Sequence, residues 1–519
     1  MTEKYRVTLL PDGESRFFDK GVLLIDLLAD MGYPADSPCG GRGVCGKCRV
    51  KGSGRFRDIF SGIVIEHKNP AEIISCRSQL SGDASIIIEN TSSTEDENYI
   101  TFSPGKKAGI AVDIGTTTIQ ISLVDLESGQ AYRQRPVINP QRRFGHDVMS
   151  RVSAVTMNPA LTENLSALTL NMIAGGIKKI STAAGLTPDF ISRVVFSGNT
   201  VMTYLLLGID ISPLGEYPYP ISHRDFRKLD INLRGTVSES AIISAIPPAS
   251  AFSGGDFISG LAVCETDGIA ENSFFIDIGT NGELFISDRG GNVTASSCAM
   301  GPALEGMNIS SGMTASSGAV NGARIEKGAL KLSVIGEAEP VGICGTGLID
   351  LISIALDRGI IDSRGTVITD KKPETPVHEG FAVDKEKRII HLQNGLTISQ
   401  KDIRNLQLAK GASLAASRII MKRADLNADE IKRVIIAGAL GENLNQKNFR
   451  RLSFLPEFKN AEWISAGNTS LRGAETACVD PGFIDLCYRI AESISIIDLA
   501  ADSSFNDEFI KALDFSKTG

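Results

Sequence analysis

The sequence predicts a small α+β domain at the N-terminus, followed by a larger α/β protein made of two related lobes. Three observations predict this organisation: a cysteine-rich loop, a polar stretch that follows the first domain, and an Asp-Ile-Gly-Thr sequence that occurs twice. At 519 residues the chain exceeds what one hydrophobic core usually supports. We expect a first domain at 1–90, a linker at 91–107, lobe 1 at 108–250 and lobe 2 at 251–519.

The composition is that of an ordinary globular protein, with 42% hydrophobic and 22% charged residues. The net charge of −8 argues against nucleic acid or an anionic membrane as a partner. No run reaches 18 apolar residues, and the first 30 residues lack the layout of a signal peptide. We therefore expect a cytoplasmic protein.

Residues 1–90 show the pattern of a β-rich domain. Tyr5–Leu10 alternates as a strand does, and Ser15–Asp19 is expected to pair with it as a hairpin. Val22–Leu28 has a short apolar helical pattern, and Ser85–Glu89 is predicted to be a closing strand. The order of strand, hairpin, helix, cysteine loop and late cysteine resembles that of the ferredoxin β-grasp fold.

Cys39, Cys45 and Cys48 lie on a glycine-rich loop, and Cys76 follows 28 residues after Cys48. The spacing C-x5-C-x2-C is one residue longer in its first gap than the plant-type ferredoxin pattern. Four thiolates are what a [2Fe–2S] cluster needs, and the glycines let backbone N–H groups approach the sulfur atoms. A structural zinc site or a disulfide pair is the alternative, although a zinc site usually has two C-x2-C pairs and this chain has one.

Five further cysteines are scattered, and we expect them to be reduced and to pack as small buried side chains. These are Cys264, Cys298, Cys344, Cys478 and Cys487.

The sequence Asp-Ile-Gly-Thr begins at Asp113 and again at Asp277, 164 residues later, each time between two predicted strands. Such a repeat indicates two structurally related lobes. The carboxylate lies at a strand end, and the turn after it offers backbone N–H groups and a hydroxyl to an anion. Two such turns facing each other would bind the phosphates of ATP, while the two carboxylates hold Mg²⁺ through its water ligands. The predicted phosphate-binding residues are Gly115, Thr116, Thr117, Gly279, Thr280 and Asn281. The alternative is a pair of ordinary hairpins.

A third motif, Val434–Asn443, is a buried strand followed by small residues and a helix start. Small residues would let an adenine lie against the backbone, and we expect contacts from Gly438, Ala439 and Glu442. This motif order resembles the actin-like superfamily of sugar kinases and Hsp70 ATPases (ASKHA, ribonuclease-H-like).

Gly345 lies in a glycine-rich turn that either approaches the nucleotide or packs closely against neighbouring backbone. No Walker A motif offers a different source of ATP binding.

Asp256 lies 21 residues before Asp277, where sugar kinases of this superfamily carry their catalytic base. A carboxylate there would orient or deprotonate the attacking nucleophile. The alternative role is an N-cap of a helix over Phe257–Val263. Further helices are predicted at Asn199–Leu207, Gly345–Leu356, Ser399–Arg423 and Phe483–Leu499.

The combined motifs resemble one family, the ATP-dependent reductive activators of corrinoid proteins. The resemblance spans nearly the whole chain, and some members carry an extra small domain where this chain has only about twenty residues. The matching stretches are Cys39–Cys48 with Cys76, Val112–Thr118, Asn139–Gln141, Gly145–Val148, Gly198–Met202, Ile276–Glu283, Gly342–Gly347 and Ala437–Asn443.

The resemblance implies a [2Fe–2S] cluster, ATP and Mg²⁺ as cofactors, with Cys39, Cys45, Cys48 and Cys76 as cluster ligands and Asp113, Asp277 and Asp256 as catalytic residues. It implies transfer of one electron to inactive Co(II) in a corrinoid methyl-carrier protein, regenerating Co(I). ATP hydrolysis is expected to change the angle between the lobes and thereby the affinity for one cobalt state. An upstream reductase or ferredoxin would reduce the cluster, and a homodimer is expected.

Three other functions stay open at this point. The first is a small-molecule kinase of the sugar-kinase type, regulated by its fused ferredoxin domain. The second is an activase for a radical dehydratase, which would share a cluster across a dimer through cysteines of the ATPase itself. The third is a redox sensor without enzymatic activity.

Overall fold

The computed structural model describes residues 3–11, 13–31, 33, 35, 43, 46, 48–88, 107–145, 147–368, 380–384 and 386–515, and the side chains of Ala439 and Glu442 are outside this description. The predicted linker therefore lies almost entirely outside the described residues. The chain divides into two compact units. Unit 1 is Met1–Ser259 with Ser470–Ala491, and unit 2 is Gly260–Thr469 with Glu492–Gly519. The domain boundaries expected from the sequence stay predictions.

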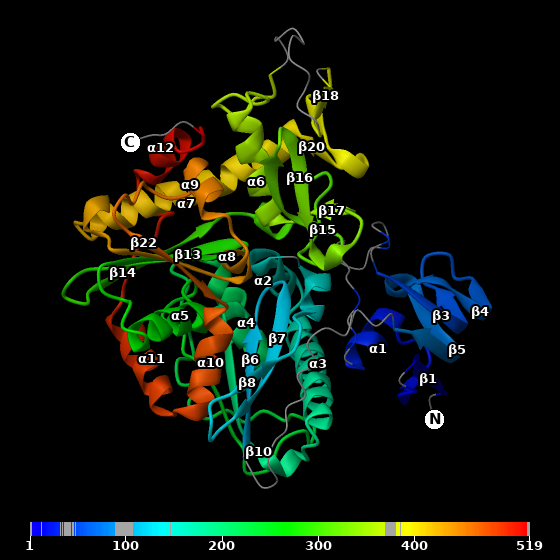
Figure 1. Cartoon of the computed structure of the whole chain (residues 1–519). Helices are drawn as coiled ribbons and strands as arrows, with labels where there is room; N and C mark the ends of the chain where they lie inside the picture. The colour runs from blue at the N-terminus through cyan, green and yellow to red at the C-terminus, as the bar shows by residue number, and fades with distance from the viewer. Residues whose placement is uncertain are drawn as a thin grey trace. The chain divides into compact units, whose positions relative to one another are not determined.

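The first part of unit 1 is a five-stranded sheet with one helix, drawn in blue in Figure 1. The strand order is β2-β1-β5-β3-β4, with β1 antiparallel to β2 and parallel to β5. The predicted hairpin at the N-terminus is confirmed. Apolar residues of β1, β5 and α1, among them Val7, Leu27 and Ile86, form the core. The elements are β1 (Lys4–Leu10), β2 (Ser15–Asp19), α1 (Leu24–Asp30), β3 (Arg49–Asp58), β4 (Val64–Ile74) and β5 (Ser78–Ile87).

The second sheet of unit 1 has the order β11-β10-β6-β7-β8, with the short strand β9 also pairing with β7. β6 is antiparallel to β7 and parallel to β10. Its strands are β6 (Ala108–Ile114), β7 (Thr118–Asp125), β8 (Ala131–Arg133), β9 (Val137–Ile138), β10 (Ile191–Gly198) and β11 (Ile242–Ala245). Helices α2 (Val148–Met157), α3 (Leu161–Ala183) and α4 (Thr200–Leu206) belong to this unit. Three helices cross its boundary: α5 (Gly255–Thr266), α10 (Thr469–Val479) and α11 (Gly482–Ser493).

The main sheet of unit 2 repeats this topology. Its order is β22-β21-β12-β13-β14-β23, and β12 is antiparallel to β13 and parallel to β21. The hairpin β12–β13 therefore occupies the same place in its sheet as β6–β7 does in the other, as the repeated sequence predicted. The strands are β12 (Ser273–Ile278), β13 (Asn281–Ser287), β14 (Val293–Ala299), β21 (Arg433–Ala437), β22 (Glu462–Gly467) and β23 (Ser495–Ile496).

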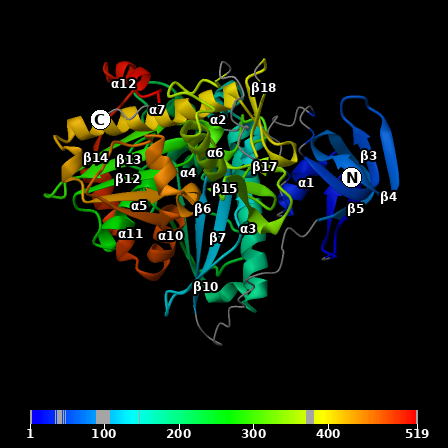
Figure 2. The ribbon, with the colours of Figure 1, turned by 45° about the horizontal axis from the view of Figure 1, so that its top comes forward.

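Two small sheets and several helices complete unit 2. The long helix α7 packs against β13 and β14, and Figure 2 shows it lying along that sheet. The remaining strands are β15 (Ala319–Glu326), β16 (Ala329–Val334), β17 (Gly342–Ile343), β18 (Ala382–Asp384), β19 (Ile389–His391) and β20 (Thr397–Ser399). The helices are α6 (Gly345–Asp357), α7 (Gln400–Arg423), α8 (Ala439–Glu442), α9 (Gln446–Arg451) and α12 (Phe505–Lys511).

Most helix predictions are confirmed. Ser399 caps α7 and forms a capping box with Asp402, because each side chain accepts a hydrogen bond from the backbone N–H of the other residue. Asn199 caps α4 in the same way through its side-chain oxygen. The helix expected over Phe483–Leu499 ends at Ser493 instead, since the chain then becomes extended and Ser495 pairs with β14. That prediction was wrong for its last six residues.

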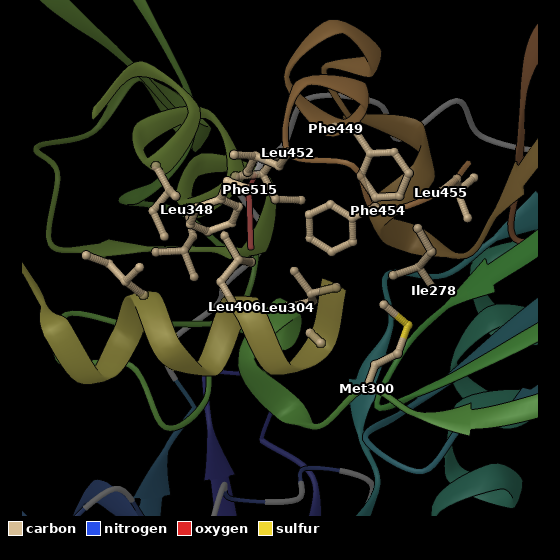
Figure 3. Close-up of a cluster of buried hydrophobic side chains, with 14 of the residues drawn as sticks. Ile278, Met300, Leu304, Leu348, Leu406, Phe449, Leu452, Phe454, Leu455 and Phe515 are labelled. Atoms are coloured by element: carbon tan, nitrogen blue, oxygen red, sulfur yellow. The ribbon is translucent and has the colours of Figure 1, made fainter. Parts of the chain in front are cut away.

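The core of unit 2 joins β12 to helices α6, α7 and α9. Figure 3 shows Ile278 at the end of β12 with Leu348 of α6 and Leu406 of α7 in one buried cluster. Phe449 and Phe454 stack with ring centroids 4.5 Å apart. This packing fixes the strand end that carries Asp277 relative to the start of α6. The five scattered cysteines are buried, as expected. Among the described residues, no helix is both long enough and apolar enough to cross a membrane.

Candidate functional site

The turn between β6 and β7 carries the first Asp-Ile-Gly-Thr sequence. Asp113 lies near the end of β6, opposite Ser197 of β10 and Gln120 of β7. Gly115 leaves no room for a side chain, because an added Cβ would lie 2.7 Å from the carbonyl oxygen of Thr118. Glycine is therefore required where the chain reverses direction.

Side chains from inside unit 1 hold this turn in place. The Asn139 amide donates a hydrogen bond of 2.8 Å to the carbonyl oxygen of Gly115, and the buried guanidinium of Arg151 donates to that of Thr116. In a trans peptide the C=O and the following N–H point to opposite sides. These bonds therefore direct the N–H groups of Thr116 and Thr117 away from the buried donors. Successive N–H groups on one side of a turn form an anion-binding concavity.

A cluster of one carboxylate and two hydroxyls lies beside the turn. The Ser470 hydroxyl is 2.6 Å from Oδ1 of Asp113, to which it donates a hydrogen bond, and 2.9 Å from the hydroxyl of Ser197. Both serines are buried. A carboxylate held by a buried hydroxyl keeps a fixed orientation, which a metal-binding or water-binding role requires.

Asp256 joins this cluster from the first turn of α5, which begins at Gly255. Its carboxylate accepts a hydrogen bond of 2.8 Å from the N–H of Phe257. Burial raises the pKa of Asp256 to about 7, and the neighbouring charge of Asp113 adds to the rise. A carboxyl group that titrates near neutrality beside a second carboxylate suits general-base chemistry. An N-cap role would require the helix to start after Asp256, whereas α5 starts before it.

Two glycines allow the start of α5 to approach the strand ends. A Cβ at Gly254 would lie 2.3 Å from Cα of Asn199, and a Cβ at Gly255 would lie 2.4 Å from the carbonyl oxygen of Ile246. Asn199 also donates a hydrogen bond of 3.0 Å to the hydroxyl of Thr116. One asparagine thus contacts the first turn and the backbone that precedes Asp256.

The turn between β12 and β13 is the counterpart in unit 2. Asp277 lies near the end of β12, as Asp113 does in β6. The carbonyl oxygen of Thr280 accepts hydrogen bonds from the N–H groups of Met300 and Gly301, at 3.2 and 2.9 Å. The Thr280 hydroxyl donates to the carboxylate of Glu305. Hydrogen bonds with other residues of unit 2 thus fix both the carbonyl group and the hydroxyl group of Thr280.

Two more predicted glycines are required by close backbone approach. Gly438 follows β21 with a φ of 84°, and a Cβ there would lie 2.5 Å from Oδ1 of Asp277. Gly345 starts α6, and a Cβ there would lie 1.9 Å from the carbonyl oxygen of Leu304 and 2.8 Å from Cδ1 of Leu440. The glycine-rich turn at the start of α6 therefore reaches the segment that carries Gly438. The predicted side chains of Ala439 and Glu442 are outside the description.

Cys48 and Cys76 lie together in the N-terminal sheet domain. Both are buried, with 1% and 2% of their surface exposed, and they belong to one small apolar cluster. The N–H and the hydroxyl of Ser75 donate to the carbonyl oxygen of Cys48 at 3.0 and 2.8 Å. Cys39 and Cys45 lie outside the described residues. Within the described part of the chain, no three His, Cys, Asp or Glu side chains are grouped as a metal site, so the four-cysteine set stays a prediction.

Comparison with known proteins identifies the family. Residues 108–268 match the model of the RACo middle region, and residues 271–519 match that of the C-terminal domain of RACo, the ASKHA domain. The chain belongs to the RACo family. A solved member, a reductive activator for corrinoid, iron-sulfur protein, is 25% identical with a TM-score of 0.69 and coverage of 98% of both chains. The match confirms the actin-like ATPase fold, which the repeated turns predicted, for the larger part of this RACo-family chain.

Two curated relatives support the same family. The corrinoid activation enzyme RamQ of Eubacterium limosum is 26% identical over 571 residues, covering 94% of this chain and 95% of its own length. The [Co(II) methylated amine-specific corrinoid protein] reductase of Methanosarcina barkeri is 26% identical over 453 residues, covering 79% and 77%.

Sequence reasoning missed four residues of this RACo-family site: Ser470, Ser197, Arg151 and Glu305. Ser470 is 357 residues from the Asp113 that it contacts, so no local pattern could reveal it. Arg151 and Glu305 do follow motif-like stretches, Gly145–Val148 and Gly301–Pro302, and both bind the threonine of a turn.

Proposed function

We propose that this chain reactivates a corrinoid protein by delivering one electron to its inactive Co(II) state, which regenerates Co(I), with ATP binding and hydrolysis driving the transfer. The observation that carries the proposal is the match over 98% of both chains to a reductive activator for corrinoid, iron-sulfur protein. Both relatives, named a corrinoid activation enzyme and a Co(II) corrinoid protein reductase, support the same reaction.

ATP with Mg²⁺ is the proposed nucleotide. Asp113 and Asp277 hold the metal through its water ligands in this proposal, because Mg²⁺ dehydrates reluctantly. Bound Mg²⁺ neutralises charge that develops on the transferred phosphate. Asp256, whose pKa is about 7, accepts a proton from the attacking water. Backbone groups of the two turns bind phosphate oxygens: Gly115, Thr116, Thr117, Gly279, Thr280 and Asn281. The proposed adenosine contacts are Gly345, Gly438, Ala439 and Glu442.

The fit of the first turn to an anion rests on its hydrogen bonds. Asn139 and Arg151 donate hydrogen bonds to two carbonyl oxygens of the turn. The N–H groups of Thr116 and Thr117 therefore point away from these two side chains. Gly438 fits a group that approaches Asp277, because any side chain there would fill the space beside that carboxylate.

A [2Fe–2S] cluster is the proposed electron carrier of the N-terminal domain, which we assign to the ferredoxin β-grasp type. The burial of Cys48 beside Cys76 fits this assignment, since a cluster requires thiolates that converge and are shielded from water. Cys39 and Cys45 would complete the ligand set. The cluster, when bound, supplies one electron at a time at low potential.

Coupling requires that ATP alter the affinity of the chain for one cobalt state over the other. A ligand shifts an equilibrium only by its difference in affinity for the two states. We infer that the ATP-bound and ATP-free forms bind the Co(II) protein with different affinities.

The kinase, dehydratase-activase and redox-sensor alternatives have no comparable support, because both family models describe RACo itself. A homodimer and an upstream reductase or ferredoxin stay predictions.

The experiment that tests this function compares Asp113→Asn and Asp277→Asn with the parent protein. Loss of a charged group near the transferred phosphate is expected to lower ATP hydrolysis by about 10²-fold or more. Co(II) reduction should fall in parallel while the iron content is unchanged. Asp189→Asn, an exposed carboxylate in unit 1, is the control and should behave as the parent. Normal hydrolysis and normal Co(II) reduction by both variants would contradict the proposed function.

A further inference from the structure

The turn between β3 and β4 exposes large apolar side chains in a way that the fold does not require. Phe60 and Ile63 have 59% and 60% of their surface exposed, and three neighbours are also exposed: Ile59, Val64 and Ile65. A second group of exposed apolar residues, Tyr217 and Phe252, packs on Tyr219, but it lies outside the N-terminal domain. Successive residues of β4 alternate between the two faces of the sheet, so the five side chains surround the tip of the hairpin and do not all lie on one face. Apolar side chains gathered at one exposed place usually mark an interaction site. We call these five residues the hairpin patch.

The turn that carries the hairpin patch is held rigidly. Oδ1 of Asp58 accepts hydrogen bonds from the N–H groups of Phe60 and Ser61 at 3.0 and 2.8 Å, and these bonds hold the pKa of Asp58 below its usual value. Oδ2 of Asp58 is also 2.8 Å from the Arg77 guanidinium. Gly62, with a φ of 71°, closes the turn. Preorganisation of this kind lowers the entropy cost of binding a partner.

The hairpin patch contacts the predicted cluster loop. An added Cβ at Gly43, which lies between Cys39 and Cys45, would be 2.9 Å from Cε2 of Phe60 and 2.9 Å from Cδ of Arg77. The Arg77 guanidinium carbon is itself 5.2 Å from the centre of the Phe60 ring. A partner seated on Phe60 would therefore lie next to the loop that carries the thiols.

Charge defines the kind of partner. Residues 49–77 contain six Lys or Arg against three Asp or Glu, although the whole chain has a net charge of −8. Two of the three acids are already paired, Glu72 with Arg49 and Asp58 with Arg77. An acidic protein surface therefore complements this hairpin. Lys68 and Pro70 lie within the edge strand β4, where its pairing with β3 shifts register, so a partner is not expected to extend the sheet.

We propose that the hairpin patch is the docking surface for an acidic redox protein that reduces the cluster of this chain. The proposal rests on the proposed function, because the loop beside Phe60 is relevant only if it carries the cluster. One electron leaves the reduced donor and enters the oxidised cluster. A donor whose potential lies below that of the cluster reduces it without ATP, so such a donor has to engage only the N-terminal domain. The corrinoid acceptor, in contrast, has to sense the nucleotide state of the ATPase. A small patch with a charged rim suits the brief encounters of redox partners.

The test uses the full-length protein with its cluster and the double variant Phe60→Ser/Ile63→Ser. The matched control is Phe17→Ser, because Phe17 is 66% exposed on β2, at the opposite edge of the same sheet. Reduction of the cluster is followed in a stopped-flow instrument after mixing with a reduced acidic bacterial ferredoxin, and separately with dithionite. Iron content and oligomeric state are measured for each protein.

We expect the ferredoxin to reduce the cluster of the double variant at least about tenfold more slowly than that of the parent. Two apolar contacts that would be buried against the ferredoxin are lost in this variant. Dithionite should reduce it at the parent rate, and Phe17→Ser should match the parent with both reductants. The parent rate with ferredoxin should also fall as salt is added. Dithionite-reduced double variant should still reduce a Co(II) corrinoid protein at the parent rate.

Three results would overturn the docking surface. Unchanged reduction by ferredoxin would show that the patch does not bind the donor. A defect confined to the Co(II) step would assign the patch to the corrinoid acceptor, and a changed oligomeric state would assign it to a second copy of this chain. Failure of the proposed function is distinguishable from all three, because the parent protein would then lack iron or fail to reduce Co(II) itself.

Discussion

The hydroxyl of Ser470 donates a hydrogen bond of 2.6 Å to the Asp113 carboxylate, although 357 residues separate the two along the chain. Ser470 lies in α10, and its hydroxyl also lies 2.9 Å from that of Ser197 on β10. The carboxylate of the first turn is thus positioned by a helix that comes late in the sequence. Its orientation depends on the packing of the whole unit rather than on the local turn.

Ser470→Ala should lower ATP hydrolysis by about tenfold, because a hydrogen bond to a charged group contributes roughly 1.5–3 kcal/mol. The effect is expected on kcat, since Ser470 positions Asp113 and touches no substrate. In an Asp113→Asn background the same change should have little further effect. Ser296→Ala, which removes a buried hydroxyl bonded to the carbonyl oxygen of Ile497, is the control and should keep the parent rate. Equal rates for both serine variants would argue against a positioning role.

The pH dependence of ATP hydrolysis should report Asp256. Its pKa is about 7 in the folded protein, so the rate should rise with pH through neutrality as the carboxyl group loses its proton. Asp256→Asn should lower the rate and remove this limb of the profile. A variant that keeps both rate and profile would show that Asp256 is not the base.

The same carboxyl group predicts a stability effect of known sign. An exposed Asp has a pKa near 3.9, so between about pH 4 and 7 the unfolded chain has released a proton that the folded chain retains. The contribution of this group to stability is therefore lost as pH rises through that window. Without nucleotide or Mg²⁺, Asp256→Asn should be more stable than the parent at pH 8 by about 4 kcal/mol, and nearly equally stable at pH 4. Thermal unfolding at the two pH values measures this difference.

Gly438→Ala should reduce ATP hydrolysis by displacing Asp277. A Cβ at this position meets Oδ1 of Asp277 at 2.5 Å, and the φ of 84° adds strain of about 1 kcal/mol. Gly291→Ala is a matched control, since Gly291 has a φ of 78° but nothing within 4 Å of an added Cβ. Both variants should unfold slightly more easily, and only Gly438→Ala should lose activity. If the two variants lose activity equally, backbone strain explains the effect and the contact with Asp277 does not.

Much of the fold could be predicted from local patterns. The repeated Asp-Ile-Gly-Thr turns indicated two related sheets, because each turn needs a strand on both sides, and the strand orders around β6 and β12 agree. The capping box at Ser399 marked the start of α7 because it involves residues three positions apart. The end of α11 could not be predicted in this way, since pairing of Ser495 with β14 depends on a distant strand.

The site was predictable only in part, for the same reason. Asp113, Asp277, Gly115 and Gly438 belong to short motifs whose chemistry is local. Ser470 reaches its partner through tertiary packing, so no spacing in the sequence indicates it. The raised pKa of Asp256 likewise depends on burial and on the charge of Asp113, which become visible only in the folded unit.

In the proposed function, ATP and the reduced cluster act together on the cobalt of a corrinoid protein. The most direct measurement follows the Co(I) absorbance after the dithionite-reduced chain, freed of excess reductant, is mixed with a Co(II) corrinoid protein. ATP, a non-hydrolysable analogue and no nucleotide are compared. We predict that Co(I) forms with ATP and that little forms without nucleotide. Equal rates and yields of Co(I) with and without nucleotide would show that ATP does not drive the transfer.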